Sequence, residues 1–207
     1  MRSTSANFYQ AIPRAPSNRP IVYTGYMVRD TPVAAALVVD FVNTRDIEDG
    51  TDELDSPVAL RRWIETRLGL RARNLDEAGW RSAVRAREAL RDVLASHNGE
   101  ALPRRAVQQL NKAGATARLG VVWTDDGGAR FEPGGSGAGG AVARIFAAVV
   151  TLQADGTWER LKVCPAGDCR YAFYDHSKNR SGRWCSMRVC GNRSKTRSFR
   201  RRQVSEG

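Results

Sequence analysis

The sequence predicts a mostly α-helical fold: a helical N-terminal domain with one small β-hairpin, followed by a small cysteine module. Two observations carry this prediction. Apolar residues recur with the period of a helix through most of the chain, and all four cysteines lie in the 27 residues from Cys164 to Cys190. The 207 residues, of which 42% are hydrophobic and 27% charged, can bury a core, which excludes wholesale disorder.

Three segments divide the chain. Residues 1–29 contain three prolines and show little periodicity, so we expect a flexible N-terminal tail. A helical domain over residues 30–157 and a C-terminal module over residues 158–207 follow. The unbroken apolar runs are far shorter than the roughly 20 residues of a membrane-spanning helix, and the N-terminus lacks the apolar segment of a secretory signal. We therefore expect a cytoplasmic protein without a membrane contact.

The first helix is expected to begin at Thr31 and Pro32, with Thr31 as its N-cap, and to end near Thr44. Nearly every position in it is apolar, which predicts a central helix. Asp40 and Asn43 are polar exceptions three residues apart, and burying either one unpaired is costly. We expect both to form hydrogen bonds to a neighbouring loop, with a ligand pocket as the alternative.

An acidic stretch over residues 46–55 follows. It has no glycine-centred calcium register, so we expect a solvated loop, with a cation site as the alternative. Ser56 then caps a second helix that Gly69 ends. Asp76 is expected to cap a third helix, with its arginines outside, and Pro103 to open a fourth. The residues expected on the apolar sides of these helices are Leu60, Trp63, Ile64, Leu68, Trp80, Val84, Leu90, Leu94, Val107 and Leu110.

The pattern then changes to the period of a strand. Residues 119–124 and 129–132 flank the turn DDGG, which predicts a β-hairpin. The glycine stretch over residues 133–140 contains G-x-G-x-x-G before an apolar helix, which is expected over residues 141–154. A dinucleotide fold needs repeated βαβ units, and the pattern predicts none, so we expect a flexible loop rather than a phosphate cradle. Residues 158–163 are expected to be extended.

The excess positive charge is confined to the last quarter of the chain. The net charge is +11, and residues 160–207 hold 13 Lys and Arg against 3 Asp and Glu. The rest of the chain is therefore nearly neutral. A module with such a field attracts polyanions, and nucleic acid is the first candidate.

The four cysteines form two pairs. Each pair encloses four residues, and fifteen residues separate the pairs. Two pairs separated by a short β-hairpin can hold one tetrahedral Zn²⁺ at about 2.3 Å from each sulfur. Two disulfides would need an oxidising compartment, an iron–sulfur cluster could use the same ligands, and four unrelated buried thiols are a further alternative. Zinc is favoured, and its expected ligands are Cys164, Cys169, Cys185 and Cys190.

Zinc would also supply folding energy that the small module lacks. Its few large apolar side chains cannot build a stable core alone, so a chelator should unfold it. His97 and His176 are expected at the surface, with His176, in the hairpin between the pairs, as an alternative ligand.

A basic helix is predicted over residues 186–202, with Ser186 as its N-cap and Cys190 in its first turn, as in treble-clef-like fingers. At about 100° per residue, Arg188 falls on the other side of the helix from the row of Arg193 and Arg197. Such a helix can grip phosphates, and a solvated basic tail is the alternative. The residues expected to contact nucleic acid are Arg188, Asn192, Arg193, Lys195, Arg197, Arg200, Arg201 and Arg202.

The residues Cys190, Gly191, Asn192 and Arg193 spell the motif of the CGNR zinc fingers, and the cysteine module resembles such a finger throughout. Upstream, the residues LVVDFVNT at positions 37–44 are similar to the opening of the ABATE domain, which typically precedes that finger. The resemblance implies a bacterial stress-induced transcription regulator, in which the four cysteines bind zinc and the finger binds DNA.

A zinc-dependent, DNA-binding transcriptional regulator is therefore favoured, with the helical domain for sensing or dimerisation. Docking on the transcription machinery and RNA binding through stacked aromatic residues are the alternatives. A homodimer and a redox switch at the thiolates are also open. Enzymatic activity is not expected and no catalytic residue is proposed, because no nucleophile with its base is evident and zinc with four thiolates has no open position.

Overall fold

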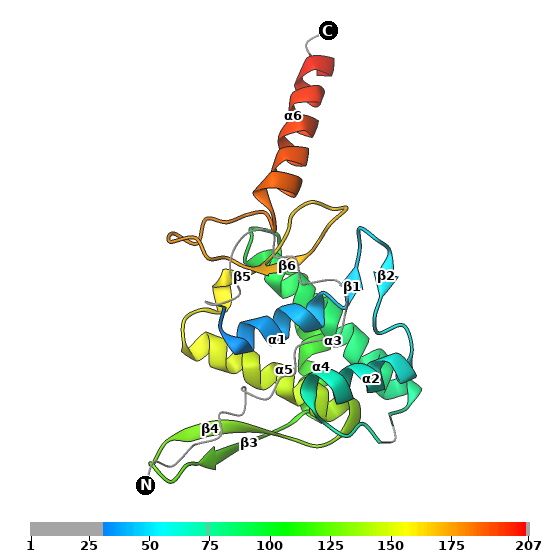
Figure 1. The fold of residues 1–207 in the computed structure, drawn as a ribbon, viewed down its shortest axis with the longest axis vertical. Coiled ribbons are helices and arrows are strands. Elements are labelled where there is room, and N and C mark those ends of the chain that lie inside the picture. Colours follow the sequence, from blue (N-terminus) through cyan, green and yellow to red (C-terminus); the bar gives the residue numbers. More distant parts are fainter. Residues whose placement is uncertain (1–30, 74, 206–207) are drawn as a thin grey trace.

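The computed structural model describes residues 31–73 and 75–205 (Figure 1). The expected tail, residues 1–29, lies outside the described residues. The helices are α1 (Val33–Val42), α2 (Pro57–Leu68), α3 (Glu77–Ser96), α4 (Arg104–Thr116), α5 (Gly137–Ala154) and α6 (Asn192–Ser205). The strands are β1 (Arg45–Asp46), β2 (Thr51–Asp52), β3 (Arg118–Trp123), β4 (Ala129–Gly134), β5 (Leu161–Val163) and β6 (Ala172–Tyr174).

The mostly α-helical class is confirmed. In the described part of the chain, β1 pairs with β2, β3 with β4 and β5 with β6, each as a separate antiparallel sheet. Of these pairings, the sequence predicted that of β3 with β4. The strands that were not predicted as hairpins have two or three residues each. Strands this short cannot establish an alternating pattern in the sequence.

Local signals place two helices correctly. The Ser56 side chain accepts a hydrogen bond from the backbone N–H of Ala59, and α2 ends at Gly69, whose φ of 63° is left-handed. Asp76 accepts from the N–H of Gly79 and caps α3. The predicted cap of α1 is wrong: Pro32 holds the N-cap position without a side-chain bond, and the hydroxyl of Thr31 lies 3.2 Å from the His176 ring instead.

The core forms around α1 and α5. Seven of the ten residues of α1 are buried, and α5 packs against α1, α2, α3 and α4. By length and composition α5 could cross a membrane, but half of it is buried inside the protein, as in the core helix of a globular domain. The apolar face predicted for α2 is confirmed, because all four of its expected residues are buried. The face predicted for α4 agrees less well with the structure, because Val107 is 41% exposed.

Two arginines of α3 are buried, contrary to the expectation that they face solvent. Arg87 is fully buried and binds both carboxylate oxygens of Asp52, at 2.6 and 2.7 Å. Arg91 is 3% exposed and donates to the carbonyl oxygens of Val42 and Arg170, at 2.6 and 2.8 Å. The acidic stretch is therefore partly structural, because one of its carboxylates neutralises a buried guanidinium.

The glycine stretch is ordered and not a flexible loop. It contributes the end of β4, and α5 already begins at Gly137. A Cβ at Gly140 would lie 2.7 Å from the carbonyl oxygen of Gly135, so the glycines permit a close turn at the start of the helix. The strand before the turn belongs to a two-stranded antiparallel sheet, which is not the context of a dinucleotide cradle.

The C-terminal module is joined to the helical body through β5 and β6. Leu161, Val163 and Ala172 belong to the same buried cluster as α1 and α5. The ring of His97 is half-buried, 2.8 Å from the carbonyl oxygen of Leu161, so its predicted surface position is wrong. Figure 1 shows α6 extending away from the body beyond this junction.

Candidate metal centre and basic helix

The four cysteines reach one point from three short segments. Cys164 directly follows β5, and Cys169 precedes β6, so this pair forms the turn of the hairpin. Cys185 lies before the π-helical turn Met187–Gly191, and Cys190 lies within it. The prediction that a hairpin separates the two pairs is therefore wrong: the hairpin contains the first pair, and an irregular loop leads to the second.

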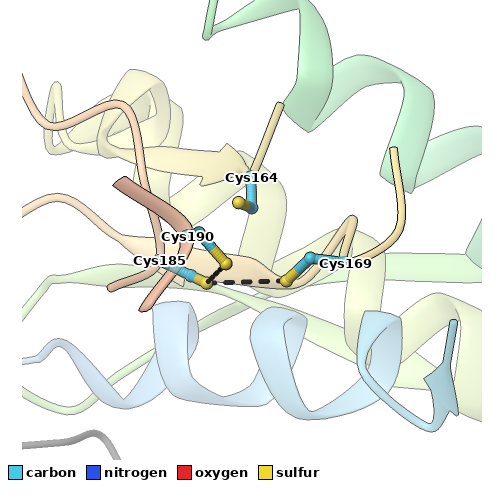
Figure 2. A group of neighbouring side chains, drawn as sticks. All are labelled: Cys164, Cys169, Cys185 and Cys190. Atoms are coloured by element: carbon cyan, nitrogen blue, oxygen red, sulfur yellow. Dashed lines mark hydrogen bonds between the residues drawn. The ribbon is translucent and has the colours of Figure 1, made fainter. Parts of the chain in front are cut away.

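The geometry of the sulfurs fits a tetrahedral metal. The Sγ atoms of Cys169 and Cys185 are 3.6 Å apart, those of Cys185 and Cys190 are 3.7 Å apart, and all four lie within 4.8 Å of one another (Figure 2). Bonds of 2.3 Å to zinc give sulfur separations of about 3.8 Å in a tetrahedron. A disulfide would need about 2.05 Å, and all four cysteines are free.

The thiols affect one another's ionisation. The neighbouring thiols of Cys169 and Cys185 lower the pKa of Cys164 to about 2. The interaction with Cys164 raises the pKa of Cys169 to about 12, and the pKa of Cys185 rises well above the ordinary value for the same reason. The thiolate of Cys164 is thus stabilised at the cost of Cys169 and Cys185. A divalent cation removes this conflict, since it binds all four as thiolates.

Arg193 lies directly beside the cluster. Its Nη2 donates to the Sγ of Cys190 at 3.2 Å, and the guanidinium also binds both carboxylate oxygens of Glu48, at 2.7 and 3.3 Å. Glu48 belongs to the acidic loop between β1 and β2. The arginine therefore links a metal-site sulfur to the helical body.

Two further clamps hold the cysteine loops. Asn43, the C-cap of α1, donates its amide to the carbonyl oxygen of Ala172 at 2.9 Å and accepts from the N–H of Ala172 at 2.8 Å. Asn98, just after α3, donates to the carbonyl oxygens of Val163 and Arg183, at 2.9 and 2.7 Å. Each asparagine fixes backbone close to a cysteine, so the body positions the metal centre.

A buried ion pair organises the loop between the cysteine pairs. The Nζ of Lys162 is 2.7 Å from the carboxylate of Asp175 and 3.0 Å from the carbonyl oxygen of Gly182. Asp175 also accepts from the backbone N–H of Ser177 and Gly182. His176 is exposed and lies outside the sulfur cluster.

Asp40 and Asn43 have separate partners. The Asp40 carboxylate lies 3.1 Å from the Arg67 guanidinium. Burial raises the pKa of Asp40 to about 6, against the opposing effect of Arg67. Asn43 faces the finger strand, as described above. Both residues therefore tie α1 to a neighbouring segment, which is a structural use of each polar group.

The basic helix begins as a π-turn rather than as an α-helix. The N–H of Gly191 bonds to the carbonyl oxygen of Ser186, five residues earlier, at 3.1 Å. This wider turn changes the angle between successive side chains. A shallow groove of about 490 Å³ lies along this turn and the first turns of α6. It is lined by Arg188, Val189, Asn192, Arg193, Thr196, Arg197 and Arg200.

The arginines of this groove differ in their partners. Arg193 is held by Glu48, and Arg197 lies 2.5 Å from the carboxylate of Asp168. Arg188 and Arg200, like Lys195 outside the groove, are exposed and form no ion pair within the described part of the chain. The expected contacts Arg201 and Arg202 have side chains outside the described part.

Sequence reasoning missed the partners of several charged residues. Glu48 and Arg91 join the body to the finger. Asp168 and Lys162 join segments within the finger, and no local pattern marks such pairs. The one available signal is a charged residue at a helix position that periodicity assigns to the core, as for Arg91.

Comparison with known families agrees with this geometry. Residues 160–203 match the family model of the CGNR zinc finger. Residues 35–156, more than half of the chain, match the ABATE model, described as "putative stress-induced transcription regulator". No curated protein matches the chain. The four converging thiols and the finger match together identify a zinc-binding protein.

Proposed function

Because the chain belongs to the ABATE family and carries a CGNR zinc finger, we propose that it is a zinc-dependent regulator that binds DNA through α6. The four cysteines would hold the zinc, and the metal would fix the start of α6 on the body. The helical domain would sense a signal or dimerise. We further propose that the protein acts in the cytoplasm and has no catalytic role, since four thiolates leave zinc no open position.

The projecting basic helix is the observation that carries this proposal. α6 leaves the body directly after the cysteine cluster (Figure 1), and its mean hydropathy is strongly polar, with Phe199 exposed rather than packed. A helix that buries no apolar face gains little stability from packing, so packing does not account for the composition of α6. Phosphates would neutralise the repulsion among its cations, so binding to a polyanion explains its composition.

The existing ion pairs divide the cations into two groups. Arg193 and Arg197 are paired with Glu48 and Asp168 at the base of the helix and would orient it. Arg188, Lys195 and Arg200 are exposed and would contact phosphates, together with Arg201 and Arg202. About five such contacts predict that log K falls with log[salt] with a slope of about −4.5.

The test is binding of the zinc-loaded chain to duplex DNA over a range of salt concentrations. Arg200→Ala should weaken binding and reduce the salt slope by about one. The control is Arg105→Ala, which removes an exposed arginine of α4 and should change neither value. Absence of DNA binding, or equal effects of the two variants, would refute the proposal.

A protein partner is the second candidate function, and one observation favours it. Met187, Val189 and Phe199 are 54%, 46% and 55% exposed, so the basic module presents apolar side chains beside its cations. This combination suits an acidic protein partner, such as a component of the transcription machinery. A complex that survives nuclease treatment and competes with DNA would favour this function. RNA stacking is less supported, because Tyr171 and Trp184 pack against the cysteine cluster.

A further inference from the structure

The hairpin formed by β3 and β4 has one apolar face. Residues that lie opposite each other in an antiparallel pair point to the same side of the sheet. The pairs Leu119 with Pro133, Val121 with Phe131 and Trp123 with Ala129 therefore share one face. The other face carries Arg118, Gly120, Val122, Arg130, Glu132 and Gly134. Such alternation is typical of a sheet with one buried face.

That apolar face is open to solvent. The exposed fraction is 74% for Trp123, 59% for Val121, 38% for Phe131 and 36% for Leu119. Five of the twelve exposed large hydrophobic residues in the described part of the chain belong to this hairpin. A two-stranded sheet is only marginally stable by itself, and a contiguous exposed apolar patch marks an interaction site. The hairpin thus has the composition of an interface.

The charge distribution indicates what covers it. The positive charge is concentrated at the end of the molecule that carries α6. Figure 1 shows the hairpin at the opposite end. The segment from β3 through β4 holds two arginines and three carboxylates and is nearly neutral. Two copies of a chain with a net charge of +11 repel each other least when they meet at these ends.

We propose that the apolar face of the β3–β4 hairpin is a self-association surface, on which a second copy of the chain packs its own hairpin face to face. A two-fold axis near the pair Val121 and Phe131 makes the contact self-complementary. The bulky Trp123 end of each hairpin then covers the Leu119 end of the other. Each basic helix then lies at the far end of its own copy, away from the contact.

The area of the face sets the strength of the contact. A strand of six residues is about 20 Å long, and two strands are about 10 Å wide. Two such faces present a flat area of only about 400 Å² in total, well below the limit of about 1,200 Å² for weak and reversible complexes. We therefore expect a dimer with a dissociation constant in the micromolar range.

The test is sedimentation of the full, zinc-loaded chain between about 1 μM and 500 μM, a range that spans the expected constant. The mean mass should rise from 22.8 kDa toward twice that value. Val121→Glu, on the apolar face, should weaken the dimer at least tenfold. Val122→Glu introduces the same charge one residue away on the opposite face and should dimerise like the wild type.

Three outcomes would overturn the proposal. The mean mass of the wild type could remain at 22.8 kDa at every concentration, which would mean that the apolar face binds a different protein and not a second copy. The two glutamate variants could dimerise equally. If Val121→Glu changes the melting temperature, Val121→Thr and Val122→Thr are used in place of the two glutamate variants. Equal dimerisation of these two milder variants is the third outcome that would refute the proposal. DNA binding by the monomer is measured separately, so the two proposals fail independently.

Discussion

The guanidinium of Arg193 completes the electrostatics of the metal centre, because it donates to the Sγ of Cys190 while Glu48 holds it in place. Residues that support metal ligands in this way typically contribute 10- to 100-fold to metal affinity. Arg193→Ala should therefore weaken zinc binding by about tenfold, measured by competition with a chromophoric chelator. Arg200→Ala, on the same helix but exposed, should leave zinc affinity unchanged. Equal zinc affinities of the two variants would contradict this role.

Asp40 should make part of the stability depend on pH. Burial raises the pKa of its carboxyl from 3.8 to about 6, so the folded state holds this proton more tightly than the unfolded state. The stabilisation is complete below about pH 4 and is lost as pH rises to about 6. The free energy of unfolding of the wild type, relative to that of Asp40→Asn, should fall by about 2 kcal/mol between about pH 4.5 and pH 7.

Urea unfolding of both proteins across that pH range checks this prediction. The other titrating groups, including the cysteines, are common to the two proteins, so the difference isolates Asp40. A difference that stays constant or rises with pH would contradict the assignment.

Single residues were predictable where their chemistry is local or their spacing is distinctive. Four cysteines in two equally spaced pairs predicted one cluster, and the structure brings their sulfurs within 4.8 Å. The roles of Arg87 and Arg91 were not predictable, because their acceptors, Asp52 and the carbonyl of Arg170, are 35 and 79 residues away. Helical periodicity shows that a position is buried, but it does not show which partner neutralises a charge there.

At the scale of elements, the finger should respond unevenly to loss of zinc. The strands β5 and β6 share the body's core, whereas the cysteine loops have only a small cluster of their own. We therefore expect a chelator to release the segment from Cys185 through α6 while β5 and β6 stay folded. This refines the sequence-based expectation that the whole module unfolds.

Hydrogen–deuterium exchange of the full chain with and without chelator measures this difference. Backbone amides of residues 185–200 should lose most of their protection, and those of β5 should change little. The body helix α3 serves as the internal control. Simultaneous loss of protection in β5 and α6 would show that zinc, and not the body, holds the hairpin.

Elements with local start and stop signals were predicted well. Ser56 and Gly69 bound α2, and Asp76 caps α3, as expected from a short polar N-cap and a left-handed glycine. The orientation of the basic residues was not predictable, since one π-turn at Met187–Gly191 rotates Arg188 relative to an ideal helix. A single turn with a different hydrogen-bond spacing leaves no clear signal in the sequence.

At the scale of the whole molecule, the zinc finger is an extension of the helical body. Asn43, Arg91, His97 and Asn98 from the body all contact backbone of the finger. These contacts position the cysteine hairpin on the body, directly before the segment that leads into α6. The charge segregation visible in the sequence corresponds to two ends of one molecule, with a basic helix at one end and an apolar hairpin at the other (Figure 1).

If the two proposals hold together, DNA length should control affinity. A dimer joined through β3 and β4 carries two distant basic helices, and the second helix binds at an effective concentration far above that in solution, a gain that reaches 10²- to 10⁴-fold. Above the dimer dissociation constant, the wild type should bind a duplex long enough to reach both helices at least tenfold more tightly than a short duplex. Val121→Glu should bind both fragments with the lower affinity, and Val122→Glu should behave like the wild type. Fluorescence anisotropy with the two labelled duplexes measures this, and equal length dependence in the two variants would show that the hairpin does not join the DNA-binding units.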